Sequence, residues 1–189
     1  MTAAPLEGER VRLRSLVRAD APALASFVNE PAVRRTALLS GPVTVEQEED
    51  FVVRVRASTV DAVFGIEWRA ERRLVGVVGL HAIDRSSRTA QFGIFVGVPA
   101  LWNRGLGAEA TRLVVRHAFE ALQLHRVWLH VFAENAAGIR CYEKVGFGRE
   151  GLLRDAVFHE GRYHDLVAMA LLRPDWAGRG AGKDGLDRP

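Results

Sequence analysis

The stretch 101-LWNRGLGAEATRLVVRHAFEALQLHRVWLHVFAEN-135 decides how the fold is interpreted. Residues 105–110 read G-x-G-x-x-A, close to the fingerprint of dinucleotide-binding folds, and Glu134 ends the next apolar run, where such a fold would hold a ribose. Small glycines before a helix let the backbone approach an anion, which free N–H groups and the helix dipole then bind. Because this physics serves any phosphate, the flanking sequence has to decide which phosphate is bound.

The flanking sequence argues against a nicotinamide enzyme. A dinucleotide fingerprint directly follows its strand and opens a series of βαβ units. Here the preceding apolar run ends near Val98 and the residues PALWNR intervene, while the β-rich runs 62–70 and 73–83 predict a hairpin upstream. A P-loop is also excluded, because G-x-x-x-x-G-K-[ST] does not occur. A nicotinamide-dependent oxidoreductase is kept as an alternative.

The whole chain predicts one mixed α/β domain over residues 1–176. Asp20 and a Thr44–Gln47 capping box mark helix starts, and Pro31 and Gly146 mark helix ends. We expect about seven mostly antiparallel strands and about four helices, followed by a flexible tail at 177–189. The expected strands are 10–16, 62–70, 73–83, 88–98, 126–132, 147–158 and 162–172, and the expected helices are 20–30, 44–58, 110–122 and 135–145.

Composition narrows the class of protein. The 189 residues are 48% hydrophobic and 26% charged, which is typical of a globular domain. No apolar run reaches about 18 residues, and the first residues lack an apolar signal core, so we expect a cytoplasmic protein without a membrane span. A net charge of +3 without a long basic run does not favour nucleic-acid binding. The single cysteine, Cys141, excludes an internal disulfide and predicts no metal cluster.

Two motifs in order carry a resemblance to a known family. They are 92-FGIFVGVPALWNRGLGAEA-110 and 135-NAAGIRCYEKVGFGREG-151, with a predicted strand between them. Together they resemble the GNAT superfamily of acyl-CoA-dependent N-acetyltransferases, and within it the ribosomal-protein N-acetyltransferase branch. The resemblance extends over nearly the whole chain, from LEGERVRLR to LLRPDW. It implies acetyl-CoA as cosubstrate, no metal, and two splayed central strands that leave a V-shaped cleft.

The resemblance also implies which residues bind the cosubstrate. The family's pyrophosphate loop falls on residues 102–107, whose backbone N–H groups would hold the pyrophosphate. The strand before it would pair with the pantetheine arm, Asn135 would bond that arm, and Tyr142 would lie near the acyl sulfur. The implied cofactor-binding residues are Phe95, Val96, Val98, Arg104, Gly105, Leu106, Gly107, Ala108, Asn135 and Tyr142.

Acetyl transfer to an amine requires removal of the amine proton, a donor for the oxyanion and an acid for the leaving thiolate. Tyr142 is the candidate acid, and His81, at the end of a predicted strand, is the candidate base. Glu109 is expected only to complement the helix dipole, and Cys141 has no predicted covalent role. Glu67, His130, Asp155, His159, His164 and Asp165 stay open as further candidates for the base.

The acceptor is expected to be a primary amine on a small molecule, a peptide or a protein N-terminus, ribosomal proteins included. Two departures from the serine-transferase members of the branch bear on a ribosomal acceptor: Gly138 stands where they have serine, and Val157 where they have glutamate. An acetyl-CoA-binding sensor without turnover is the alternative from another class. The sequence leaves open whether the chain forms a homodimer.

Overall fold

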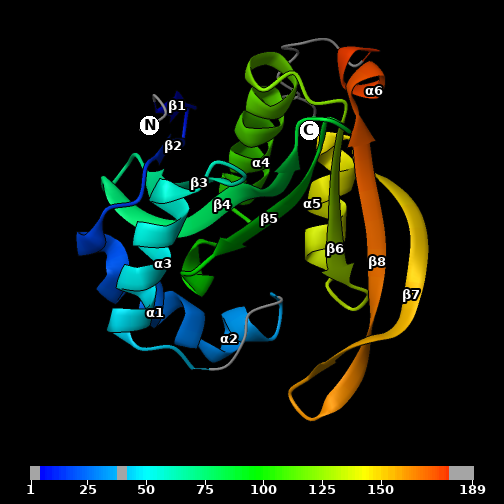
Figure 1. The fold of residues 1–189 in the computed structure, drawn as a ribbon. Helices are drawn as coiled ribbons and strands as arrows, with labels where there is room; N and C mark the ends of the chain where they lie inside the picture. The colour runs from blue at the N-terminus through cyan, green and yellow to red at the C-terminus, as the bar shows by residue number, and fades with distance from the viewer. Residues whose placement is uncertain (1–4, 38–41, 179–189) are drawn as a thin grey trace.

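The computed structural model describes residues 5–37 and 42–178, which form one open sheet of eight strands (Figure 1). The strands are β1 (Leu6–Glu7), β2 (Val11–Arg14), β3 (Ala62–Trp68), β4 (Arg73–Asp84), β5 (Thr89–Val96), β6 (Arg126–Phe132), β7 (Gly148–His159) and β8 (Arg162–Leu172). Their order across the sheet is β1-β2-β3-β4-β5-β6-β8-β7. Neighbours are antiparallel except β5 and β6, which are parallel.

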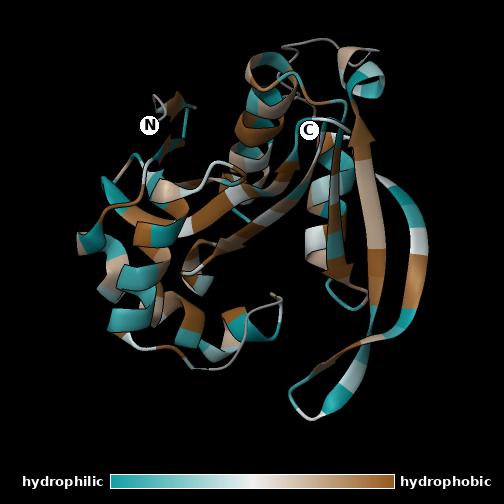
Figure 2. Cartoon of the chain, in the orientation of Figure 1, coloured by the Kyte–Doolittle hydropathy of each residue, from teal (hydrophilic) through white to brown (hydrophobic). Residues whose placement is uncertain are grey.

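Helices cover both faces of the sheet. They are α1 (Ala21–Asn29), α2 (Pro31–Arg34), α3 (Val45–Ala57), α4 (Leu106–Arg116), α5 (Ala136–Val145) and α6 (Arg173–Gly178). Leu24 of α1 and Val52 of α3 pack against Val77 of β4, whereas α4 and α5 pack on the larger core cluster. Figure 2 shows the matching pattern, with hydrophilic residues turned outward on α1 and α3. The fold class predicted from the sequence is therefore confirmed.

Local signals in the sequence located most elements correctly. The capping box is present, since the Thr44 hydroxyl accepts from the Gln47 N–H at 3.3 Å and the Gln47 side chain accepts from the Thr44 N–H at 2.8 Å. The strand at 126–132 lies where it was expected, and the strands expected at 147–158 and 162–172 are joined by a turn at 160–161. The short elements β1, α2 and α6 were not predicted, because each has too few residues to show a period.

Two local predictions need correction. Asp20 stands at the N-cap position of α1, but its side chain does not cap that helix. Its carboxylate instead accepts from the Val17 N–H at 2.8 Å and pairs with Arg14 at 2.8 Å, because a guanidinium from β2 reaches it. The periodic pattern expected to run as helix to residue 122 also changes after Arg116, where His117–Ala121 form a π-helical turn.

The last described helix overlaps the first two residues of the expected tail. Helix α6 extends through Gly178, and Trp176 packs its ring 6.1 Å from that of Phe119. Residues 179–189 of the expected tail lie outside the described residues. None of the described helices is long and apolar enough to cross a membrane.

The parallel pair β5–β6 separates soon after it forms. Three residue pairs join the strands, and the last is Gln91 with Trp128. Beyond this pair β5 continues along β4 as far as Val96, and β6 continues along β8 as far as Phe132. The two halves of the sheet therefore diverge, which confirms the predicted splay of the central strands (Figure 1).

Candidate active site

The loop before α4 turns through two left-handed residues. Asn103 has φ 61° and Gly105, at the N-cap position of α4, has φ 81°. Asparagine and glycine are the residues that adopt this region most readily. A Cβ atom at position 105 would also lie 2.8 Å from Nη1 of Arg10, so a larger residue would require the end of this side chain to shift. Such turns direct successive backbone N–H groups to one side, as in anion-binding nests.

The backbone N–H groups of residues 103–108 have no acceptor within the part of the chain that the structure describes. Three of them open α4, where N–H groups lack intrahelical partners and the helix dipole is positive. The loop itself is held from outside: Arg10 donates from Nη1 to the Arg104 carbonyl at 2.9 Å, and the Glu109 carboxylate accepts from the Arg10 N–H at 3.0 Å. The loop therefore presents a fixed row of free donors.

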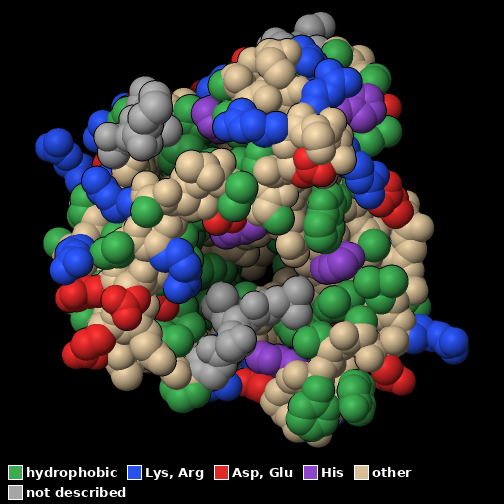
Figure 3. Space-filling model, in the orientation of Figure 1, with side chains coloured by type: hydrophobic (Ala, Val, Ile, Leu, Met, Phe, Trp, Pro, Cys, Tyr) green, Lys and Arg blue, Asp and Glu red, His purple; other side chains and the backbone are tan. Residues whose placement is uncertain are grey.

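A cavity of about 500 Å³ lies between this loop, the end of β5, α2 and α5. In Figure 3 the molecule is hollowed between the half that carries α1 and α3 and the half that carries β8, with histidine side chains near the rim. Val98 and Arg104 do not line the cavity. The other eight of the ten predicted cofactor-binding residues do: Phe95, Val96, Gly105, Leu106, Gly107, Ala108, Asn135 and Tyr142.

Strand β5 offers a free backbone edge to the cavity. Past Gln91 its edge toward β6 has no strand partner among residues 5–37 and 42–178, and such an edge can pair with an extended chain. Trp102 fixes the end of this strand to the loop, because its indole N–H donates to the Val96 carbonyl at 2.8 Å. The Val96 carbonyl is thereby already engaged within the protein.

The side chain of Asn135 is largely engaged as well. Its Oδ1 accepts from the Gly138 N–H at 2.9 Å and so caps α5, while its Nδ2 donates to the Thr36 carbonyl at 3.0 Å across the cleft. A Cβ atom on residue 138 would lie 2.9 Å from Nδ2 of Asn135, which explains the glycine at this position. One amide hydrogen of Asn135 is left for a ligand.

Tyr142 lies on α5 and lines the cavity, as predicted. Its ring meets Phe92 edge-on at 6.0 Å and Phe147 at 6.0 Å, so packing fixes its orientation. Burial, with a smaller contribution from the neighbouring Cys141, raises the pKa of the Tyr142 phenol. The hydroxyl therefore keeps its proton at neutral pH and can act as a hydrogen-bond donor.

His81 does not line the cavity but lies close to the point where the strands separate. It is 40% exposed and stands opposite Gln91, the last β5 residue that pairs with β6. Its Nδ1 lies 3.4 Å from Oδ1 of Asp61, and its Nε2 lies 3.6 Å from where a Cβ atom of Gly93 would be. The ring thus lies over β5 at the vertex of the V.

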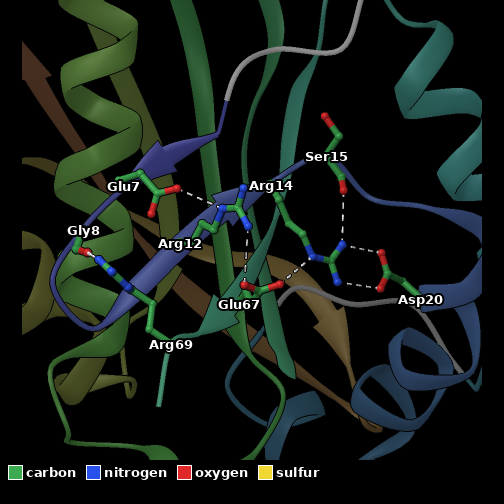
Figure 4. A network of polar contacts seen from close by, with 8 residues as sticks. All are labelled: Glu7, Gly8, Arg12, Arg14, Ser15, Asp20, Glu67 and Arg69. Carbon is green, nitrogen blue, oxygen red and sulfur yellow. Dashed lines mark hydrogen bonds and ion pairs between the residues drawn. The ribbon is translucent and has the colours of Figure 1, made fainter. Parts of the chain in front are cut away.

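The other candidate bases from the sequence are placed less favourably. Glu67 accepts from Nε of Arg14 at 3.1 Å and lies 4.0 Å from Arg12, within an ionic network on the outer part of the sheet (Figure 4). His159 contacts the Arg34 carbonyl at 3.0 Å, and Asp165 accepts from the Asp155 N–H at 2.8 Å. His130 packs edge-on against Trp128 at 5.2 Å.

Glu134 and His164 are partners of each other. Nδ1 of the buried His164 lies 2.6 Å from Glu134, and its Nε2 lies 3.0 Å from the His159 carbonyl. Arg162 also donates to Glu134, at 2.8 Å. The carboxylate that a dinucleotide fold would use for a ribose is therefore engaged by protein side chains, which removes the main support for a nicotinamide site.

Several cavity residues were not predicted. Arg140, Cys141 and Lys144 lie on the same helical face as Ala137, so the three-and-four spacing within α5 could have identified them. Val33, Thr36 and Ala37 come from α2 and the turn after it, and no local signal marks their approach to the cavity. The two cations of α5 add positive charge to a cavity that already carries free N–H groups.

Comparisons with known proteins agree with this geometry. A model of the acetyltransferase (GNAT) domain matches residues 10–148. The chain belongs to the GNAT acetyltransferase family. It is 31% identical over 173 residues to the N-acetyltransferase YoaA of Bacillus subtilis, which covers 89% of this chain and 97% of YoaA. These matches identify an acetyl-transferring enzyme and exclude the nicotinamide alternative.

Two further GNAT proteins are informative about ligands. Spermidine N(1)-acetyltransferase of Vibrio cholerae is 33% identical over 110 residues, which covers 58% of this chain and 63% of that protein. The crystal structure of the Vibrio cholerae spermidine N-acetyltransferase in complex with CoA and spermine has a TM-score of 0.82 at 26% identity, and the match covers 90% of this chain and 99% of that one.

The environment of Tyr142 predicts how its phenol titrates. The chain has two tyrosines, so the difference between the wild type and Tyr142→Phe isolates the phenolate absorbance of residue 142. Because burial raises the pKa of this phenol, we expect no ionisation of Tyr142 up to about pH 10, the ordinary midpoint for tyrosine. Half-ionisation at or below that pH in the folded protein would contradict the packing described for this ring.

Proposed function

We propose that the protein transfers the acetyl group of acetyl-CoA to a primary amine by direct attack within a ternary complex. The observation that carries the proposal is the row of free N–H groups at residues 103–108, which continues into the open edge of β5 along one cavity. An anionic group followed by an extended, amide-bearing arm matches this arrangement. Acetyl-CoA has that form, with its pyrophosphate at one end and its pantetheine arm at the other.

The donor is positioned by backbone contacts. The pyrophosphate accepts from the N–H groups of residues 103–108, and Arg140 and Lys144 add charge on the same side of the cavity. The pantetheine arm pairs with the free edge of β5 and takes the remaining amide hydrogen of Asn135. The thioester then lies near the vertex of the V, between Tyr142 and His81.

The reaction moves one acetyl group and one proton. The amine nitrogen attacks the thioester carbonyl carbon and loses a proton to a base, for which His81 is the candidate. Collapse of the tetrahedral intermediate breaks the C–S bond, and the thiolate accepts a hydrogen bond, and finally a proton, from the Tyr142 hydroxyl, which regains a proton from solvent. A free thiol has a pKa of about 8.5, so the thiolate leaves tolerably well and this assistance is partial.

The acceptor is proposed from chemistry and from the relatives. The spermidine acetyltransferases favour a small-molecule amine, and a peptide or protein N-terminus, ribosomal ones included, stays the second candidate. Gly138 distinguishes this chain from the serine-containing members of the ribosomal branch, and in this structure it lies close to the side chain of Asn135.

A thiol-release assay across polyamines, amino acids, aminoglycosides and N-terminal peptides tests the proposed function. We expect acetyl-CoA-dependent thiol release above the hydrolytic background with at least one class, and mass spectrometry should find one added acetyl group on the amine. Tight acetyl-CoA binding without turnover for any class would favour the sensor alternative over an enzyme.

Substitution of Gly107 tests the donor site. A Cβ atom there would meet only Val96, at 3.9 Å, so Gly107→Val should fold but place its methyl groups over the free N–H groups. We expect acetyl-CoA affinity to fall by about 10-fold or more, which is about 1.4 kcal/mol, in calorimetry. Gly151→Val is the matched control, because nothing lies within 4 Å of a Cβ atom at that position. Unchanged affinity in a folded Gly107→Val variant would refute this placement of the pyrophosphate.

Substitution of Tyr142 tests the acid. Tyr142→Phe keeps the ring packing and removes only the hydroxyl, so kcat should fall by about 10²-fold, at the low end for general acid catalysis, with little change in acetyl-CoA affinity or Tm. Tyr163→Phe is the control, because Tyr163 is 62% exposed on β8. An unchanged kcat with chemistry rate-limiting would make Tyr142 structural, and a parallel loss of affinity would make it a binding residue.

A further inference from the structure

Asp61 is held rigidly beside His81. It lies in the connection between α3 and β3, where its Oδ2 accepts from the Ser58 hydroxyl at 2.7 Å and its Oδ1 accepts from the Ala82 N–H at 3.2 Å. Burial alone would raise the pKa of this carboxyl group, but these hydrogen bonds and His81 hold it below its ordinary value. The group is therefore an ionised carboxylate whose Oδ1 stands 3.4 Å from Nδ1 of His81.

The backbone next to His81 is distorted at the same place. The β4–β5 register shifts between His81 and Asp84, and Ala82 has a left-handed φ of 48°. This conformation is unfavourable for a non-glycine residue, and bulges of this kind redirect a side chain next to a site. The Ala82 N–H is bound by Asp61, and the Ile83 N–H by the Val60 carbonyl at 2.7 Å. The segment 58–61 thus holds both the bulge after His81 and the His81 ring itself.

The other nitrogen of the ring faces β5. Nε2 of His81 lies 3.6 Å from the position that a Cβ atom of Gly93 would take, and Gly93 follows closely after Gln91, where β6 leaves β5. Because residue 93 has no side chain, the space over β5 at the vertex stays open. Among the described residues, no hydrogen-bond partner is found for this nitrogen, and Asp61 is the one charged side chain within ion-pair distance of the ring.

We propose that Asp61 is a positioning residue that keeps the proton of His81 on Nδ1, so that the lone pair of Nε2 faces the open space over Gly93 and accepts the proton of the attacking amine. The proposal rests on the proposed function for its chemical role. As the N–C bond forms, the amine proton moves to Nε2 and the ring becomes a cation beside the Asp61 carboxylate. The proton passes to solvent after the C–S bond has broken.

His130 provides the contrasting case. It lies on β6 across the cleft, and its ring packs against Trp128 without an ion-pair partner in the described part of the chain. A neutral imidazole without such a partner has no fixed tautomer. Of these two rings, His81 is therefore the one whose geometry is prepared for proton transfer before a substrate arrives.

The tautomer can be measured without any turnover. In protein with labelled histidine, long-range proton–nitrogen correlations distinguish the two neutral tautomers, and His81→Gln assigns the signal among the six histidines. At a pH where the ring is neutral, we expect the Nδ1–H form of His81 in the wild type and a mixed or Nε2–H form in Asp61→Ala. An Nε2–H form in the wild type, or an unchanged signal in Asp61→Ala, would overturn the proposal.

Kinetics test the chemical role of the pair. With the best acceptor of the panel, Asp61→Ala should lower kcat by about 10²-fold, while acetyl-CoA affinity stays within about twofold. Asp61→Asn, which removes the charge but keeps the shape of the side chain, should lower kcat in the same direction. Asp84→Asn is the matched control: Asp84 lies on the same strand end but binds Ser86 and Ser87 instead of the ring.

The outcomes separate the two proposals. Absence of thiol release from the wild type contradicts the proposed function and leaves the tautomer measurement to decide the role of Asp61. Normal turnover in both Asp61 variants refutes the positioning role while the acetyltransferase function stands. A lower Tm without a change in tautomer would show that Asp61 only stabilises the bulge, which also refutes the proposal.

Discussion

The pairing of β5 with β6 stops at Gln91 and Trp128, and this leaves backbone polar groups of β5 without a strand partner. A packed cluster lies directly after the last pair. Phe92 is buried against Tyr142 and Phe147, which belong to α5 and the chain just after it. Beta pairing with β8 holds β6 along its whole length at the same time. The gap is thus built into the packing, and it provides an open edge for an extended ligand.

The anion-binding loop depends on the same strand and on a distant one. Trp102 joins the loop to the end of β5, so the free N–H groups and the free edge keep a fixed relation. Arg10 lies in the turn between β1 and β2. It supports the loop because it donates hydrogen bonds to the Arg104 carbonyl and to the Glu109 carboxylate. The Glu109 side chain, which the sequence explains by the helix dipole alone, therefore also joins α4 to the chain before β2. These contacts join the loop to the N-terminal strands.

Structural features that depend on a few consecutive residues could be predicted from the sequence. Contacts between side chains from distant segments could not. The capping box at Thr44, the left-handed turn at Gly105 and the helix end at Gly146 follow from local backbone chemistry. Two motifs in order were sufficient to identify the family. The ion pair of Asp20 with Arg14 and the contact of Asp61 with His81 depend on which segments become neighbours in the fold. No local sequence pattern encodes that arrangement. Most of the loop and cavity could therefore be predicted, but the partners of its polar side chains could not.

Amide hydrogen exchange followed by NMR, with and without acetyl-CoA, tests most directly whether the loop and the open edge of β5 hold the donor. We expect acetyl-CoA to slow exchange of the N–H groups of residues 103–108 and of amides on β5 after Gln91, because these donors are otherwise free. Amides of the turn at 160–161 should be unchanged. Binding of acetyl-CoA without protection of the 103–108 amides would contradict the account.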